Sequence, residues 1–204
     1  MSIILVRHGE TLLNVSRTLQ PADTPLSERG LAQAAAVARR LASLRIAGIV
    51  SSDLPRARVT AQTIGRATGL PVATTALLQE RNYGELRGMA YDSIGFDPLT
   101  LEGAPPGGES VASFRGRIAD AFAHVLRLRA ALDGPLAVVT HGLAIRAMLD
   151  AHVRLADGAA LPVHVGNTSI TIIAAEPPHR VSLLDCTRHL DPPNADDAHG
   201  LSGG

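Results

Sequence analysis

Short runs of apolar residues alternate along the chain with longer stretches in which apolar residues recur every three or four positions. The runs at 3–6, 48–51 and 136–140 consist mainly of isoleucine, valine, leucine and alanine. Such runs are typical of strands that are buried on both faces of a parallel sheet. Two later runs, at 168–174 and 181–184, complete the predicted strands.

The stretches with helical periodicity have recognisable ends. Ser27 is a good N-cap for a helix that runs to about residue 44. Ser51 or Ser52 is expected to cap a helix that continues to Thr68 and ends at Gly69. Further helices are predicted at 110–132 and 143–153, and a short helical turn at 10–16. The residues expected to face inward from the first long helix are Leu31, Ala34, Ala35, Ala38, Leu41 and Ala42.

This order of elements predicts an α/β fold, a three-layer α/β/α sandwich with a mostly parallel central sheet. Residues 1–190 are expected to form one domain. Within it, 77–108 is rich in glycine and proline and is interpreted as an excursion that covers the substrate. The polar residues 191–204 are expected to form a flexible C-terminal tail.

Polar groups follow three of the predicted strands directly, at 7–9, 51–53 and 140–142. If these strands are parallel neighbours, the three groups meet at one edge of the sheet. In open α/β sheets this carboxyl edge is where ligands bind. The pattern therefore predicts a binding site built from strand ends.

Composition narrows the classes of function. Lys+Arg and Asp+Glu both number 19, and aromatic residues make up 2% of the chain, so nothing favours nucleic acid as a partner. Cys186 is the only cysteine, which excludes an internal disulfide and fits a reducing compartment. No signal peptide or membrane span is apparent, and we expect a cytoplasmic protein without membrane contact. A homodimer is left open.

The side chains at the predicted edge suit phosphate chemistry. A neutral His8 imidazole can attack phosphorus, and a backbone carbonyl can fix its tautomer. Arg7 and Arg56 can hold phosphate oxygens, and His141, if protonated, adds another donor. Asn14 lies close enough in sequence to reach the same oxygens. These groups neutralise the dianion, so we expect neither a metal nor another cofactor.

The leaving alcohol needs a proton, and Glu80 is the candidate general acid. That role requires a raised pKa in a partly desolvated pocket. Taken alone, a loop glutamate beside Arg81 is more often solvated.

Several short segments run in a recognisable order along the chain: 7–11 with Asn14, 23–30, 33–34, 51–54 with 56–57, 60–61, Glu80 with 83–84 and Gly88, 107–110 with Arg117, 140–142 and 167–169. With these segments the sequence resembles the phosphoglycerate-mutase-like branch of the histidine phosphatase superfamily. The resemblance implies that His8 is the phosphorylated nucleophile, that Arg7, Arg56 and His141 form the phosphate pocket, and that Glu80 is the proton donor. It also implies that Thr11 and Asn14 support the pocket, and Gly142, beside His141, is counted with the phosphate-binding residues.

One departure concerns the loop before Asp23. Relatives often carry glycine after its glutamine, whereas Pro21 follows Gln20 here, which puts the shape of this loop in question. The tryptophan that many relatives have after the acid is also absent.

Three functions remain open from the sequence. The first is a phosphomonoesterase acting on a small-molecule phosphate ester. The second is a cofactor-dependent phosphoglycerate mutase, and the third a non-catalytic phosphate-binding module. Only residues 81–107 separate Glu80 from the Gly-Glu-Ser motif, and this short insert favours an open pocket that admits water, hence hydrolysis.

Overall fold

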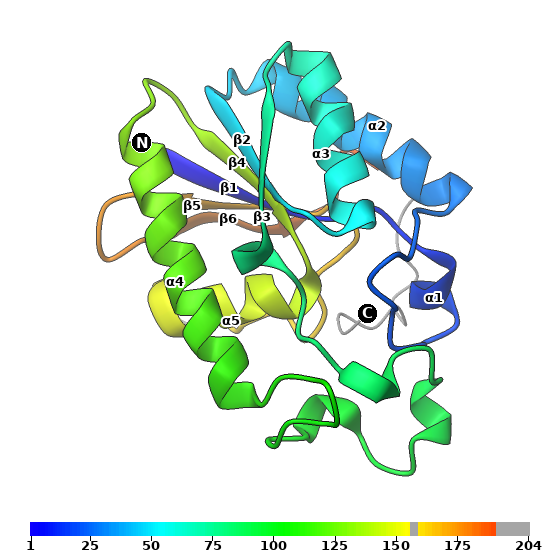
Figure 1. Cartoon of the computed structure of the whole chain (residues 1–204). Coiled ribbons are helices and arrows are strands. Elements are labelled where there is room, and N and C mark those ends of the chain that lie inside the picture. Colours follow the sequence, from blue (N-terminus) through cyan, green and yellow to red (C-terminus); the bar gives the residue numbers. More distant parts are fainter. Residues whose placement is uncertain (156–158, 191–204) are drawn as a thin grey trace.

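The computed structural model describes residues 1–155 and 159–190, so the predicted tail at 191–204 lies outside the described part of the chain. Its strands form one sheet in the order β3-β2-β4-β1-β5-β6 (Figure 1). The strands are β1 (Ser2–Arg7), β2 (Gly48–Ser52), β3 (Val72–Thr75), β4 (Leu136–Thr140), β5 (Ile170–Ala174) and β6 (Val181–Cys186). The α-helices are α1 (Leu12–Val15), α2 (Glu28–Ser43), α3 (Pro55–Thr68), α4 (Val111–Ala130) and α5 (Gly142–His152).

The three strands predicted to share an edge are parallel neighbours. β4 lies between β1 and β2, and Leu136 is in register with Ile3 on one side and Gly48 on the other. β3 extends the parallel part beyond β2. β5 and β6 add antiparallel strands on the other side of β1. The prediction of a mostly parallel sheet with converging strand ends is therefore confirmed.

Helices cover both faces of the sheet, which gives the expected three layers (Figure 1). Alternate residues of β1 point to opposite faces, as strand geometry requires. Ile3 and Leu5 pack into a cluster with residues of α4 and α5. Ile4 and Val6 pack into a second cluster with residues of α2 and α3. Because β1 is buried on both faces, its carboxyl end is held firmly.

The helix ends agree with the sequence at two of the three caps. The Ser27 hydroxyl accepts a hydrogen bond from the Gly30 N–H at the start of α2, and Gly69 ends α3 in the left-handed conformation. The cap predicted for α3 is wrong, because Leu54 is its N-cap. Ser52 instead lies two residues earlier, where its hydroxyl accepts from the Leu54 N–H at 3.2 Å.

The inward face of α2 was predicted only in part. Ala34, Ala38 and Leu41 are buried, but Leu31 is 50% exposed. Ala42 is exposed as well. The buried face includes Val37 instead, because the helix turns a slightly different side toward β1.

The connection from β3 to α4 consists of loops and short 3₁₀ turns, named η1 (Ala76–Leu78), η2 (Gly84–Leu86), η3 (Tyr91–Ser93) and η4 (Pro98–Thr100). Residues 76–109 are called the connecting segment below. Backbone hydrogen bonds attach it to the loop after α1: Leu19 donates to Met89, and Tyr91 donates to Arg17. That residues 1–190 are one domain and that this segment covers a substrate stay predictions.

None of the helices in the described ranges combines the length and the apolar character that crossing a membrane demands.

Candidate active site

The carboxyl ends of β1, β2 and β4 bring His8 and His141 together. The backbone N–H of His8 donates to the Thr140 carbonyl at 2.9 Å. This hydrogen bond extends the β1–β4 pairing one residue beyond the strand. Both imidazoles are fully buried, and their ring centroids lie 5.1 Å apart at an interplanar angle of 60°. The strand ends therefore hold two imidazoles face to edge.

The tautomer of His8 is fixed by its own chain. Nδ1 lies 2.7 Å from the Gly9 carbonyl, an acceptor, so Nδ1 carries the proton and Nε2 the lone pair. The Gly9 N–H donates to Thr60 Oγ1 on α3 at 3.1 Å. The predicted carbonyl partner for His8 is thus present, and it is the next residue in the chain.

Gly9 is required by close packing of two backbones. Its backbone does not adopt a positive φ, so a special turn conformation is not the cause. A Cβ at Gly9 would collide with the Gly30 carbonyl, and one at Gly30 would collide with the Glu10 carbonyl. Two glycines therefore let the start of α2 approach the backbone beside His8.

The backbone carbonyl of His8 accepts hydrogen bonds from two residues of the segment 167–169. Asn167 Nδ2 donates to it at 2.9 Å, and the Thr168 N–H at 3.3 Å. The segment 167–169 belongs to the family pattern, but its role was not predicted. Its contact with the backbone of the nucleophile candidate supplies one.

Arg7 and Arg56 bring two buried guanidinium groups to the same place, with 1% and 2% of their surfaces exposed. Arg7 donates to the Val165 carbonyl through Nη1. Burial lowers the pKa of Arg56 to about 10, with Glu80 opposing this shift and Arg87 and Arg7 adding to it. Arg56 therefore remains charged at neutral pH, and its Nε has no hydrogen-bond partner among the described residues.

Pro21 does not displace the loop from the site. Its carbonyl accepts hydrogen bonds from Arg56 Nη1 at 3.4 Å and from Thr24 Oγ1 at 2.8 Å. The departure from the family pattern thus leaves this loop bonded to one of the two arginines.

Thr11, Asn14 and Gln20 form a buried amide network next to the two arginines. Thr11 caps α1 by accepting from the Asn14 N–H at 3.0 Å, and its hydroxyl lies 3.0 Å from Gln20 Oε1. Asn14 Oδ1 accepts from the Thr11 N–H at 3.1 Å. These bonds occupy the amide oxygens and leave Asn14 Nδ2 and Gln20 Nε2 without partners among the described residues.

Gln20 was missed as a site residue, although its loop was singled out. Buried amide N–H groups normally have partners. Two of them beside two arginines make a surface suited to an anion. The sequence shows only that Gln20 lies six positions after Asn14. Without the fold of the loop, this spacing does not indicate that the two amides are close.

His141 favours its neutral form in this environment, and the expectation that a protonated His141 adds a donor stays a prediction. Burial, followed by the charge of Arg56 and by His8, holds its pKa well below the usual range. Its Nε2 lies 2.9 Å from Ser52 Oγ, which also accepts from the Leu54 N–H. When the Ser52 hydroxyl donates to Nε2, the ring proton is on Nδ1, which has no partner among the described residues.

Gly142 is the first residue of α5 and is buried directly after His141. The N-terminus of a helix favours anions, because its N–H groups and its dipole both point toward them. The sequence placed Gly142 in the binding set, and the fold places it at the matching end of α5.

Glu80 is buried, with 4% of its surface exposed, and is not solvated as a loop glutamate usually is. Oε1 accepts from the Arg81 N–H and Oε2 from the Leu143 N–H, both at 3.0 Å. Burial raises its pKa, while the two N–H donors and the charges of Arg56 and Arg7 counteract the shift. The direction matches what a general acid requires.

A pair of charged residues fixes the backbone that carries Glu80. Arg117 on α4 donates to both carboxylate oxygens of Glu109, at 2.8 and 2.7 Å. The same guanidinium donates to the carbonyls of Leu77, Gln79 and Glu80 at 3.0, 2.8 and 3.3 Å. Burial works against ionisation of Glu109, but Arg117 and the Asn82 N–H hold its pKa below the usual value.

The described residues hold no group of three or more His, Cys, Asp and Glu side chains arranged to bind a metal. The positive charge at the strand ends comes instead from Arg7 and Arg56.

The comparisons with known proteins agree with this arrangement. The family model of the histidine phosphatase superfamily (branch 1) matches residues 3–184. The chain belongs to this superfamily, whose members are phosphatases or mutases.

Named relatives of both kinds are similar to the chain. A probable phosphoglycerate mutase GpmB of Yersinia pestis is 35% identical, over 97% of this chain and 98% of its own length. A mycobacterial glucosyl-3-phosphoglycerate phosphatase in complex with VO3 is 32% identical, with a TM-score of 0.72 over 85% of this chain and 90% of its own. A phosphoglycerate mutase from Thermus thermophilus is 33% identical, with a TM-score of 0.64 over 90% and 97%.

Proposed function

We propose that this chain is a phosphomonoesterase that hydrolyses small phosphorylated metabolites through a phosphohistidine on His8, with Glu80 as the proton donor. In the first step, His8 Nε2 forms a bond to phosphorus while the bond from phosphorus to the ester oxygen breaks. The departing oxygen takes its proton from the Glu80 carboxyl, which becomes a carboxylate. The released product is the alcohol.

In the second step, water attacks the phosphorus of the phosphohistidine. The Glu80 carboxylate accepts a proton from this water, and the electron pair of the N–P bond returns to Nε2. Inorganic phosphate leaves, and the enzyme regains both its neutral histidine and its protonated glutamate. Splitting one displacement into two is the usual advantage of a covalent intermediate.

The observation that carries the proposal is the orientation of His8. Its Nδ1 bond to the Gly9 carbonyl makes Nε2 the nucleophilic nitrogen. Donors for the phosphoryl oxygens would be Arg7, Arg56 Nε, Asn14 Nδ2 and Gln20 Nε2. Thr11 supports them by orienting the two amides.

A bound dianion would change the state of His141. Its pKa is depressed by burial and by neighbouring positive charge, and a phosphoryl group would offset that charge. We propose that His141 gains a proton as the ester binds and then donates to an equatorial oxygen together with the α5 N-terminus at Gly142.

Hydrolysis is preferred over phosphoryl transfer to a second hydroxyl because the short insert at 81–107 favours an open pocket that admits water. The alternative is a phosphoglycerate mutase, which the names of the Yersinia and Thermus relatives favour. An assay for interconversion of 2- and 3-phosphoglycerate, run beside a phosphate-release screen, separates the two activities.

The test of the nucleophile is His8→Asn, with His124→Asn on α4 as a control away from the site. We expect hydrolysis of p-nitrophenyl phosphate in the presence of EDTA by the wild type and the control. Loss of the nucleophile should reduce the rate on the order of 10⁴-fold or more. Acid-labile phosphoryl labelling should vanish with it. Labelling that persists in His8→Asn would identify another nucleophile.

A further inference from the structure

Thr168 has an uncommon backbone conformation directly beside the exit of β1. Its φ of 54° lies in the left-handed region, which β-branched residues rarely adopt, and the residue is fully buried. Such conformations persist where the surrounding contacts hold them, and they cluster at functional sites. Here the Thr168 N–H donates to the carbonyls of Arg7 and His8, at 3.1 and 3.3 Å. Thr168 therefore holds the backbone that carries the proposed nucleophile.

A chain of hydrogen bonds reaches Thr168 from α2. Arg40 Nη1 lies 3.2 Å from Nδ1 of His189, and His189 Nε2 lies 3.2 Å from Thr168 Oγ1. Thr168 Oγ1 in turn lies 2.7 Å from the Asn167 carbonyl. Arg40 and His189 are both outside the segments that match the family pattern, and the sequence gave neither of them a role.

The direction of every bond in this chain follows from its two ends. A guanidinium only donates, so His189 Nδ1 accepts from Arg40 and the ring proton lies on Nε2. Burial and then the charge of Arg40 lower the pKa of His189 to about 4, so the ring is neutral at neutral pH, as this bond requires. A carbonyl only accepts, so the Thr168 hydroxyl donates to Asn167 and accepts from Nε2. His189 therefore joins a donor to an acceptor.

The end of β6 anchors this chain on both sides. Arg40 Nη1 and Nη2 each lie 3.3 Å from Sγ of Cys186, the last residue of β6. The preceding residue, Asp185, accepts from the Gly166 N–H at 2.9 Å through Oδ1. Gly166 begins the turn that contains Thr168. The turn and the arginine are therefore held by the same strand end, and the histidine connects them.

The position of the His8 backbone depends on this turn. Asn167 Nδ2 donates to the His8 carbonyl at 2.9 Å, and the Thr168 N–H donates to the same oxygen. Attack on phosphorus requires reacting atoms about 3–3.5 Å apart, and a misplacement of about 1 Å can cost about 10²-fold in rate. A residue that fixes this turn therefore affects the rate of attack without contacting the ester.

We propose that His189 is a positioning residue for the attack of His8 on the phosphoryl group. It connects Arg40 to Thr168, holds Thr168 in its left-handed conformation, and so fixes the backbone from which the His8 imidazole extends. The inference rests on the proposed function, because its readout is the rate at which His8 becomes phosphorylated.

The first test measures the single-turnover rate of p-nitrophenol release from p-nitrophenyl phosphate, with the enzyme in saturating excess. This rate reports formation of the phosphohistidine and does not depend on the share of a variant that folds. His189→Phe keeps a ring and removes both nitrogens, and we expect about a tenfold loss. His189→Gln offers an N–H to Thr168 and an oxygen to Arg40, so it should recover most of the rate. His124→Phe, the same change on α4, should keep the wild-type rate.

Binding of the phosphoryl group should change much less than the rate. Arg56 and Gln20, two of the proposed phosphate donors, belong to α3 and to the loop after α1. The inhibition constant of inorganic phosphate should therefore differ by about threefold at most between His189→Phe and the wild type.

The second test asks whether Arg40 and His189 act in series. Arg40→Gln should also lower the single-turnover rate, and the double variant with His189→Phe should lose no more than His189→Phe alone. Arg39→Gln, at the exposed neighbouring position on α2, is the matched control and should keep the wild-type rate.

The outcomes separate the two proposals. A wild type that releases no p-nitrophenol, or that is labelled at a residue other than His8, contradicts the proposed function. Where His8 is labelled, an unchanged rate in His189→Phe overturns the role of His189 alone. So does a loss in His189→Gln equal to that in His189→Phe, a pair of losses that multiply in the double variant, or a loss in phosphate binding as large as the loss in rate.

Discussion

The two halves of the candidate site are held in place by different means. His8 and His141 follow strands whose backbones are paired on both sides, and His8 itself continues the pairing through the Thr140 carbonyl. Glu80 belongs to the connecting segment, where side chains take the place of a sheet. Arg117 and Glu109 fix its backbone from α4.

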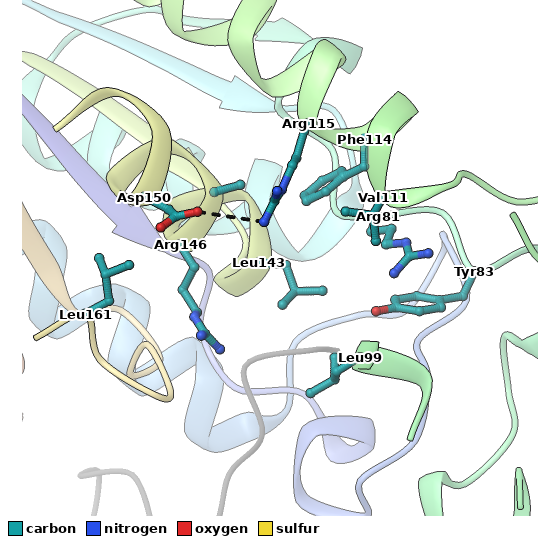
Figure 2. Close-up of a pocket in the computed structure, with 11 residues that line it drawn as sticks. Arg81, Tyr83, Leu99, Val111, Phe114, Arg115, Leu143, Arg146, Asp150 and Leu161 are labelled. Atoms are coloured by element: carbon teal, nitrogen blue, oxygen red, sulfur yellow. Dashed lines mark ion pairs between the residues drawn. The ribbon is translucent and has the colours of Figure 1, made fainter. Parts of the chain in front are cut away.

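This difference separates two tasks. In the proposed mechanism, the sheet edge orients the nucleophile and the groups for the phosphoryl oxygens, which every ester presents alike. The connecting segment positions Glu80, the proposed proton donor, which would act on the leaving alcohol, the part in which esters differ. The same segment contributes Tyr83 and Leu99 to the wall of a cavity beside α4 and α5 (Figure 2). Changes at the sheet edge should therefore affect all substrates equally, whereas changes in the connecting segment should depend on the leaving group.

Among the variants that test this division, and after His8→Asn itself, the largest effect is expected from Arg56→Ala at the sheet edge. Removing a donor for developing charge costs on the order of 10²–10³-fold in rate. The loss should be the same for p-nitrophenyl phosphate and for an alkyl phosphate, measured as kcat/KM. Arg58→Ala, at an exposed position of the same helix, is the matched control. A loss confined to one ester would break the division of tasks.

A smaller and selective effect is expected from Glu80→Gln. Alkyl phosphates should lose about 10²-fold in kcat/KM, whereas p-nitrophenyl phosphate should lose much less, because its leaving group needs little protonation. Glu85→Gln, exposed in the same segment, is the control. Equal losses for the two esters would remove Glu80 from the role of proton donor.

The same variant has a signature in pH. Burial raises the pKa of Glu80, so its acid form persists above the usual carboxyl range. For alkyl esters, kcat/KM should be highest below this raised pKa and should decline as pH rises through it. Glu80→Gln should lack this alkaline decline.

The smallest effect is expected from Glu109→Gln, which weakens the ion pair without touching the site. Arg117 then holds the backbone of 77–80 less firmly, and we expect about a tenfold loss for alkyl phosphates, with p-nitrophenyl phosphate little affected. Glu102→Gln is an exposed control in the same segment. The pH at which kcat/KM for alkyl esters declines should stay the same, while the maximum of kcat/KM is lower. This result would mark Glu109 as a positioning residue.

Much of this arrangement is predictable from the sequence, because it depends on local pattern. The order of the strands was not predicted. Apolar runs and caps nevertheless identify the strands and most helix ends, and strands that are parallel neighbours bring their carboxyl ends to one edge. The meeting of 7–9 with 140–142 was therefore expected and is confirmed.

What the sequence does not show depends on contacts between distant segments. Nothing in the pattern around Ser52 indicates that it lies beside His141 rather than at the helix cap. The link from Arg117 to residues 77–80 spans about forty positions along the chain. Gln20 Nε2 is oriented by the hydrogen bond that the Thr11 hydroxyl donates to Oε1 of the same amide.

The close contact between Gly9 and Gly30 has a consequence for anyone who would redesign this protein. Because neither position leaves room for a methyl group, the strand exit and the start of α2 form an invariant scaffold for a library of variants. Diversity is better introduced in the connecting segment, for example at Gly103, which has open space around it and no positive φ. New specificities should therefore be obtained by exchanging loops on a preserved phosphoryl-transfer frame.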